Sequence, residues 1–124
     1  MTMKKLLVFL ILALFLITMP LSVAASENPT IGEKNAVKKA INYIELMPFS
    51  QKGLIHQLEF EGFSNKESVY GATHIEVDWN EQAALKAQSY LDLMSFSKKG
   101  LIHQLEFEGF TKEQAEYGVE AVGY

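Results

Sequence analysis

The chain has 124 residues, with 15 acidic side chains, 11 basic ones and no cysteine. Because no disulfide can form, any fold has to be held together by packing. All 11 basic residues are lysines. Arginine is the side chain best shaped for paired hydrogen bonds to phosphate and guanine, so its absence argues against nucleic-acid recognition.

The N-terminal segment has the pattern of an export signal. Lys4 and Lys5 precede a long apolar run, which ends in small residues just before Ser26. We expect residues 1–25 to be a signal peptide cleaved before Ser26. The alternative is an uncleaved membrane anchor, because the apolar stretch is close to the ~20 residues that span a bilayer. Both readings predict an exported protein, secreted or held at the cell surface or membrane and not cytoplasmic. Residues 26–34 are assigned to a linker.

The rest of the chain contains a duplication. The sequence GLIHQLEFEGF occurs at residues 53–63 and again, unchanged, at residues 100–110. More identities follow at the same offset of 47, which indicates a duplicated structural unit. We assign the first repeat to residues 35–75, a joint to 76–82 and the second repeat to 83–124. Units of ~40 residues are usually too small to fold alone, so we expect the two repeats to stabilise each other.

Helical periodicity predicts the first helix of each repeat. Apolar side chains recur at helical spacing in both copies, which gives each helix one core-facing stripe. The stripe consists of Ala36, Ala40, Ile44 and Met47 in the first copy and of Ala83, Ala87, Leu91 and Met94 in the second. Thr30 with Glu33, and Asp78 with Glu81, have the spacing of N-terminal caps.

The second helix of each repeat is predicted to begin after a serine, Ser50 or Ser97, whose hydroxyl can accept from free backbone amides. In the first copy Leu54, Ile55 and Leu58 are expected to point inward. Gly62 and its counterpart Gly109 can adopt a left-handed backbone, and we expect them to end this helix.

The third helix is predicted to begin at Ser64 in the first copy and at Thr111 in the second, each followed three residues later by Glu or Gln as in a capping box. Its buried face is larger in the second copy, with Ala115, Val119 and Val122 against Ser68, Ala72 and Ile75 in the first. We therefore predict an all-α fold of two tandem three-helix repeats of helix-turn-helix type, the second packed better than the first.

The repeats resemble a known family. The run FSKKGLIHQLEFEGFTKEQAEYGVEAV, preceded by ALKAQSYLDLM and VDWNEQA, is similar to the repeat of the Ltp-like host cell surface-exposed lipoproteins. The resemblance implies exported tandem repeats displayed on Gram-positive cells. Some members, carried by temperate phages, act in superinfection exclusion by contacting the injection apparatus of an incoming phage. The family's usual anchor is a lipidated cysteine, which these 124 residues lack.

Neither a metal centre nor a catalytic site is predicted. His56 with Glu59, and His103 with Glu106, form H-x-x-E pairs, but zinc and di-iron sites need three or four converging ligands, and no matching helix supplies them. The hydroxyls of the repeats are explained as helix caps, at Ser50, Ser64, Ser97 and Thr111. We therefore expect a protein that is not an enzyme and that binds no cofactor.

Negative charge is concentrated in the second repeat. Without residues 1–25, nine lysines (the 11 of the chain less Lys4 and Lys5) stand against 15 acidic residues, a net charge of −6. An acidic third helix would repel a phosphate backbone, so the helix-turn-helix shape does not predict DNA binding. We hypothesise that one acidic surface docks a basic protein such as a phage injection or tape-measure protein; it comprises Glu106, Glu108, Glu113, Glu116 and Glu120. The alternative is an ordinary solvated helix face.

Trp79, the only tryptophan, lies in the joint. We expect it to pack one repeat against the other, since the two small cores have to meet there. The alternative is a surface anchor for a partner. For the whole chain, the sequence favours a cell-surface protein that blocks phage DNA entry. The alternative is an envelope interaction or structural module that binds a cellular ligand and is unrelated to phage.

Overall fold

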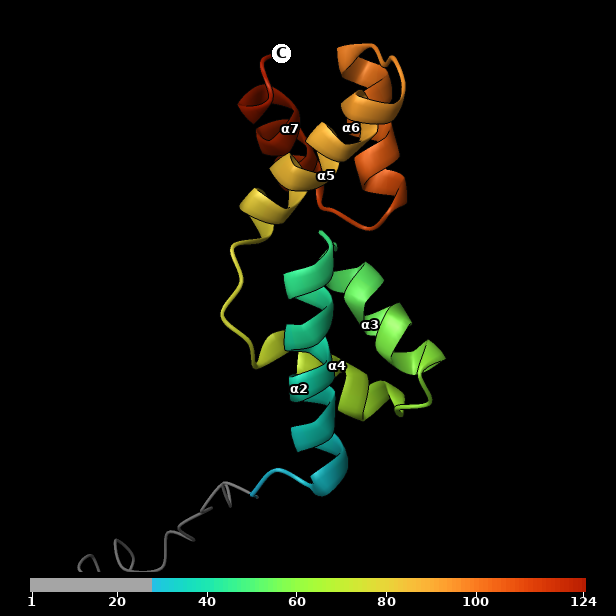
Figure 1. Cartoon of the computed structure of the whole chain (residues 1–124), viewed down its shortest axis with the longest axis vertical. Coiled ribbons are helices and arrows are strands. Elements are labelled where there is room, and N and C mark those ends of the chain that lie inside the picture. Colours follow the sequence, from blue (N-terminus) through green and yellow to red (C-terminus); the bar gives the residue numbers. More distant parts are fainter. Residues whose placement is uncertain (1–27) are drawn as a thin grey trace, which may run out of the picture.

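The computed structural model describes residues 28–124, in which helices are the only regular secondary structure (Figure 1). The all-α prediction is confirmed. The first three helices form one group and the last three another: α2 (Ile31–Leu46), α3 (Gln51–Phe60) and α4 (Asn65–Thr73), then α5 (Trp79–Leu93), α6 (Lys98–Phe107) and α7 (Lys112–Ala121). The predicted signal or anchor, residues 1–25, lies outside the described residues. Among residues 28–124, no helix has both the length and the hydropathy needed to cross a membrane.

The first helix of each repeat begins at its cap, a few residues before the assigned repeat boundary. Thr30 Oγ1 accepts from the Glu33 amide at 3.1 Å, and the Glu33 carboxylate accepts from the Thr30 amide at 3.2 Å. Asp78 accepts from the amides of Asn80 and Glu81 at the start of α5. Since these caps set the first turns, residues 31–34 of the assigned linker and 79–82 of the assigned joint are helical.

Hydroxyl caps also begin the other four helices. Ser50 accepts from the Gly53 amide at 2.8 Å, and Ser97 accepts from the Gly100 amide at 3.0 Å. Ser64 and Thr111 cap α4 and α7 as parts of two capping boxes. The caps of the second and third helices are thus repeated at the same offset of 47 as the identical segment, whereas Thr30 and Asp78 are 48 residues apart, so α5 begins one position later in its repeat than α2 does.

Left-handed glycines end the second helices. The backbone φ angle is 104° at Gly62 and 105° at Gly109, a region that residues with a Cβ atom rarely adopt. The following Phe63 and Phe110 amides then bond back to the carbonyls of Leu58 and Leu105, five residues earlier. This closure turns the chain toward the third helix.

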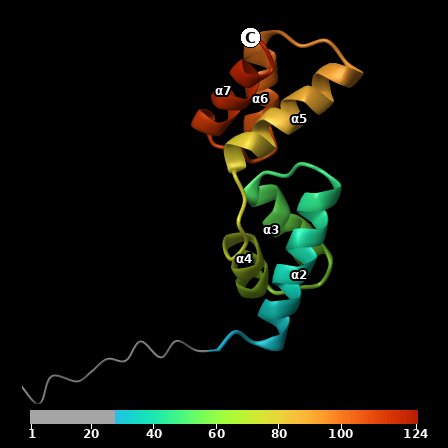
Figure 2. The same cartoon turned by 60° about the vertical axis from the view of Figure 1, so that its left-hand side comes forward.

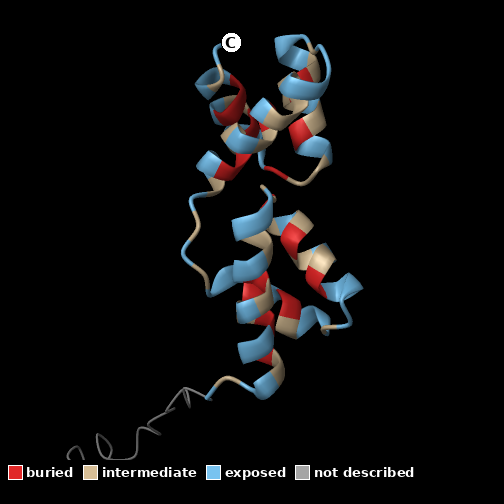
Figure 3. Cartoon of the chain, viewed as in Figure 1, coloured by how far each residue is buried: buried red, intermediate tan, exposed pale blue. Residues whose placement is uncertain are grey.

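Each group of helices has its own core (Figure 3). The first core contains Ala40, Leu54, Leu58 and Ala72. The second is larger, with Ala83, Ala87, Leu101, Leu105, Phe110, Ala115 and Val119. One difference lies in the turn phenylalanine: Phe110 is 4% exposed, whereas its counterpart Phe63 is only partly buried. The second repeat therefore has the larger core. This agrees with the larger buried face expected for its third helix.

Two apolar positions do not lie where the sequence predicts. Met47 and Met94 were expected to continue the core-facing stripe, but they are 48% and 56% exposed. Both residues are C-caps with extended backbones, near φ −160° and ψ 160°. Each helix ends one residue before its methionine. Helical periodicity therefore does not determine the direction of these two side chains.

Close helix crossings depend on a glycine in each third helix. A Cβ atom added at Gly71 would lie 2.8 Å from the carbonyl oxygen of Ala36, and one at Gly118 would lie 2.6 Å from the carbonyl carbon of Ala83. Real Cβ atoms do not approach so closely. Glycine therefore lets α4 pack on α2 and α7 pack on α5.

The two repeats are stacked along the long axis, joined by residues 74–78 (Figure 2). Two hydrogen bonds cross the junction: the Phe49 amide donates to Gln82 Oε1 at 3.0 Å, and the Ser50 hydroxyl donates to the Glu108 carbonyl at 2.6 Å. Trp79, although it begins α5, packs against the core of the first repeat. Direct contact between the repeats is thus concentrated at the start of α3, the α6–α7 turn and the start of α5.

Candidate partner-binding surfaces

A polar network is repeated in both copies and links the first helix of each repeat to the end of the second. In the first repeat, the Tyr43 hydroxyl donates to the Glu61 carboxylate and accepts from the Gln57 side chain at 3.2 Å. Lys39 Nζ lies 3.7 Å from the same carboxylate. These bonds hold α2 against the C-terminal end of α3, so they explain structurally why Gln57 and Glu61 occur in the repeated segment.

The same network in the second repeat engages Glu108. Tyr90 donates its hydroxyl to the Glu108 carboxylate, Gln104 donates to Tyr90 at 3.1 Å, and Lys86 Nζ lies 3.7 Å from Glu108. Burial raises the pKa of the Glu108 carboxyl, and the nearby Lys86 ammonium lowers this pKa by a smaller amount. Glu108 belongs to the predicted docking surface. Its carboxylate also binds side chains of α5, and its carbonyl accepts from Ser50.

The other four acidic residues of the predicted docking surface differ in their surroundings. Glu116 lies 3.9 Å from Lys112 and Glu120 lies 3.8 Å from Lys98, in exposed ion pairs of small energetic value. Within residues 28–124, Glu106 and Glu113 form no ion pair, and both are exposed. Glu113 lies in the first turn of α7, where the helix dipole favours a negative charge.

The largest exposed apolar side chains are also duplicated. Phe60 and Phe107, the last residues of α3 and α6, are each 86% exposed. Leu46 and Leu93, at the ends of α2 and α5, are 80% and 83% exposed. The sequence alone does not select these four residues, because they belong neither to the predicted core-facing stripes nor to the predicted helix caps. The available signal was that each pair recurs at the offset of 47.

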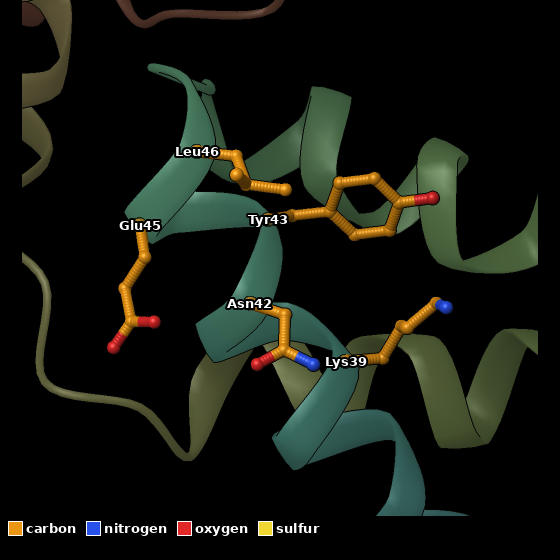
Figure 4. A pocket seen from close by; sticks show the side chains of 5 residues that line it. All are labelled: Lys39, Asn42, Tyr43, Glu45 and Leu46. Carbon is orange, nitrogen blue, oxygen red and sulfur yellow. The ribbon is translucent and has the colours of Figure 1, made fainter.

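A surface hollow of about 470 Å³ lies along α2 (Figure 4). Figure 4 shows Lys39 and Tyr43 extending to the same side of the helix, with Glu45 pointing away from them. Leu46 and Asn42 complete the lining. Since Lys39 and Tyr43 are both engaged with Glu61, this hollow offers no pair of free groups for acid–base chemistry.

Neither metal binding nor nucleophilic catalysis is supported by side-chain geometry in the described part of the chain. Residues 28–124 contain no group of three or more His, Cys, Asp or Glu side chains that could hold a metal ion. His56 and His103 are exposed on α3 and α6. The hydroxyls of Ser50, Ser64 and Ser97 accept from backbone amides as helix caps.

Two consecutive segments, residues 32–75 and 78–122, match the protein family described as host cell surface-exposed lipoprotein. The segments coincide with the two groups of three helices and together cover more than half of the chain. This chain belongs to that family. Its membership confirms the resemblance seen in the repeated segment and the division into tandem repeats. The family is described as lipid-modified, whereas these 124 residues contain no cysteine to carry a lipid.

A solved structure is also similar. Ltp, a superinfection exclusion protein from the Streptococcus thermophilus temperate phage TP-J34, shares 34% sequence identity with this chain and superposes with a TM-score of 0.70. The match covers 75% of this chain and 97% of the Ltp chain. Nearly all of the Ltp chain thus has a counterpart here. Comparison with curated protein sequences gave no match.

Proposed function

We propose that this chain is a cell-surface binding protein that acts in superinfection exclusion, without enzymatic activity, by contacting the injection apparatus of an incoming phage and blocking DNA entry. The observation that carries the proposal is the match to Ltp, a superinfection exclusion protein, over 97% of that chain at 34% identity. Membership of a family described as exposed on the host cell surface supports the required location.

The acidic surface of the second repeat is proposed to dock the partner. Its available charges are Glu106 and Glu113, which are unpaired within the described residues, together with Glu116 and Glu120, whose ion pairs with lysines are exposed and readily exchanged. Such a surface favours a basic protein by steering it electrostatically. Glu108 is the fifth acidic residue of this surface, and its carboxylate is already engaged by Tyr90 and Lys86.

The first experiment expresses the full chain in a phage-sensitive Gram-positive host, with surface display verified by labelling of intact cells. Plaques and unadsorbed phage are then counted for a varied phage panel. The proposal predicts fewer plaques with at least one phage and unchanged adsorption. Reduced adsorption would instead indicate a masked receptor. Unchanged plaque counts throughout the panel, despite verified display, would favour the envelope module that binds a cellular ligand.

Charge reversal tests the docking surface. The triple variant Glu106→Lys, Glu113→Lys, Glu120→Lys is compared with a control that makes the same change in net charge elsewhere: Glu45→Lys, Glu76→Lys, Asp92→Lys. All six positions are exposed. The first variant is expected to lose protection and the control to keep it. If both variants protect as well as the wild type, the acidic surface is not the docking surface.

A further inference from the structure

Phe60 and Phe107 are the most exposed large apolar side chains in residues 28–124, at 86% each. Neither belongs to the core of its repeat. A phenylalanine in this position leaves apolar surface in water, whereas burial of its side chain is favourable by roughly 1.5–3 kcal/mol. The fold of the repeat therefore does not account for an aromatic residue at this position in either copy.

Divergence elsewhere makes this repetition informative. The sequence from Lys52 to Phe60 is identical to that from Lys99 to Phe107. By contrast, most exposed positions of the other helices have changed between the copies, although Leu46 and Leu93 are the same, as are Tyr70 and Tyr117. Lys38 corresponds to Leu85, Asn42 to Ser89, Lys66 to Glu113 and Val69 to Glu116. Recent duplication would have left those surfaces alike as well, so it does not explain why residues 52–60 and 99–107 are identical throughout.

The preserved surface has a defined chemistry. His56 and Phe60 are four residues apart on α3, so they lie on one side of the helix, and exposed Glu59 is adjacent to the phenylalanine. Glu61, on the other side of Phe60 in sequence, is engaged by Tyr43 and Lys39. Each repeat thus presents one apolar ring beside one carboxylate that forms no ion pair within the described residues. Such a surface is complementary to a partner that presents an apolar side chain next to a basic one.

The two copies of this surface are carried by corresponding helices of the stacked repeats. Helices α3 and α6 lie on the same side of the long axis, at the right in Figure 1. A ligand that engages two sites on one chain gains affinity because the second contact is made at a high effective concentration. Duplication then has a consequence for binding that a single repeat would lack.

We propose that Phe60 and Phe107 are two equivalent contact residues that bind one elongated protein partner. This partner presents apolar side chains next to basic ones at two successive positions. The inference rests on the proposed function, because the partner is the phage protein that exclusion would require. Exposed aromatic residues are frequent centres of binding energy when a partner covers them.

The test compares Phe60→Ala, Phe107→Ala and the double variant with wild type in the plaque assay. The matched control is Leu46→Ala with Leu93→Ala, which removes a different pair of exposed apolar side chains at the same offset. We expect the double variant to keep the wild-type melting temperature, because both rings are exposed, and to restore plaque formation by about tenfold or more. Each single variant should lie in between, and the leucine control should still protect.

The possible failures are distinct. If wild type gives no protection, the proposed function is wrong and this inference falls with it. If wild type and the double phenylalanine variant protect equally, the inference alone is wrong. A membrane contact is tested with vesicles of phosphatidylglycerol and phosphatidylcholine. Binding by the wild-type protein that is lost in the double variant would show that the two rings contact lipid, and would overturn the protein-partner proposal.

Discussion

The Ser50 hydroxyl donates a 2.6 Å hydrogen bond to the backbone carbonyl of Glu108, which lies 58 residues further along the chain. The same oxygen accepts from the Gly53 amide at 2.8 Å. One side chain therefore both caps α3 and holds the turn of the second repeat, and it is only 3% exposed. Its counterpart Ser97 caps α6 in the same way but is exposed to solvent.

This asymmetry predicts different effects of the same substitution. Both Ser50→Ala and Ser97→Ala remove a helix cap, which costs about 1 kcal/mol of unfolding free energy. Ser50→Ala also removes a buried hydrogen bond between the repeats, so it should cost about 1 kcal/mol more than Ser97→Ala. Urea unfolding followed by circular dichroism measures both. Equal losses would mean that the bond to Glu108 contributes nothing to stability.

Ser68 provides a stabilising substitution. Its hydroxyl oxygen is fully buried and has no hydrogen-bond partner within the described residues. The corresponding residue of the second repeat is Ala115, also fully buried. Ser68→Ala should therefore raise the unfolding free energy by about 1 kcal/mol, because an unsatisfied buried polar group is removed. The reverse change, Ala115→Ser, should lower it, and thermal unfolding of the two variants decides the point.

The close helix crossing at Gly118 predicts that Gly118→Ala lowers the stability of the fold. Helix propensity alone would predict that the same substitution raises it. At an open position inside a helix, replacing glycine by alanine stabilises by about 1 kcal/mol. A Cβ atom at Gly118 would lie 2.8 Å from both the carbonyl oxygen of Ala83 and the amide nitrogen of Ala84. We therefore expect Gly118→Ala to destabilise by about 1–3 kcal/mol, since α7 has to move away from α5. An increase in the urea midpoint would contradict this packing.

The position of Glu108 predicts a dependence of stability on pH. Burial raises the pKa of this carboxyl above its ordinary value of 4.5, against the smaller opposing effect of Lys86. The folded state therefore binds its proton more tightly than the unfolded state does, and stability is lost as pH rises from the ordinary pKa through the raised one. Glu108→Gln removes this titration and keeps an oxygen that can accept from Tyr90.

The measurement for Glu108 is a difference between two proteins, which cancels the titration of the other carboxyls. The melting temperature of Glu108→Gln relative to wild type should increase as the pH rises from about 4 to about 7. A relative melting temperature that falls over this range would mean that the charged carboxylate is favoured by the fold, through Lys86, more than burial disfavours it.

Much of the fold could be predicted because its determinants are local. The caps at Ser50, Ser64 and Thr111 set helix starts through bonds to amides three residues away, and Gly62 ends a helix through its own φ angle. These patterns can be read directly from the sequence. The family resemblance was predictable for the same reason, since it was carried by these motifs.

The surfaces were harder to predict because exposure depends on neighbouring helices. The residues next to Glu108 in the sequence do not distinguish it from an acidic residue that is free at the surface. Its carboxylate nevertheless binds Tyr90 and Lys86, about twenty residues earlier in the chain. Phe60 has the spacing of neither a core residue nor a cap, and its exposure follows from where α3 ends. The hydrogen bond from Ser50 to the Glu108 carbonyl depends on how one repeat is placed against the other. A local sequence pattern does not carry this information.

A block at injection is tested most sharply by the amount of DNA that enters the cell per adsorbed phage. Cells with and without the displayed chain are infected with a phage whose plaque count the chain reduces, and nuclease-protected phage DNA inside the cells is quantified alongside adsorption. If the chain blocks injection, adsorption is equal and internal phage DNA falls markedly when the chain is present. Normal internal DNA together with reduced plaques would place the block after injection and would contradict the proposed contact with the injection apparatus.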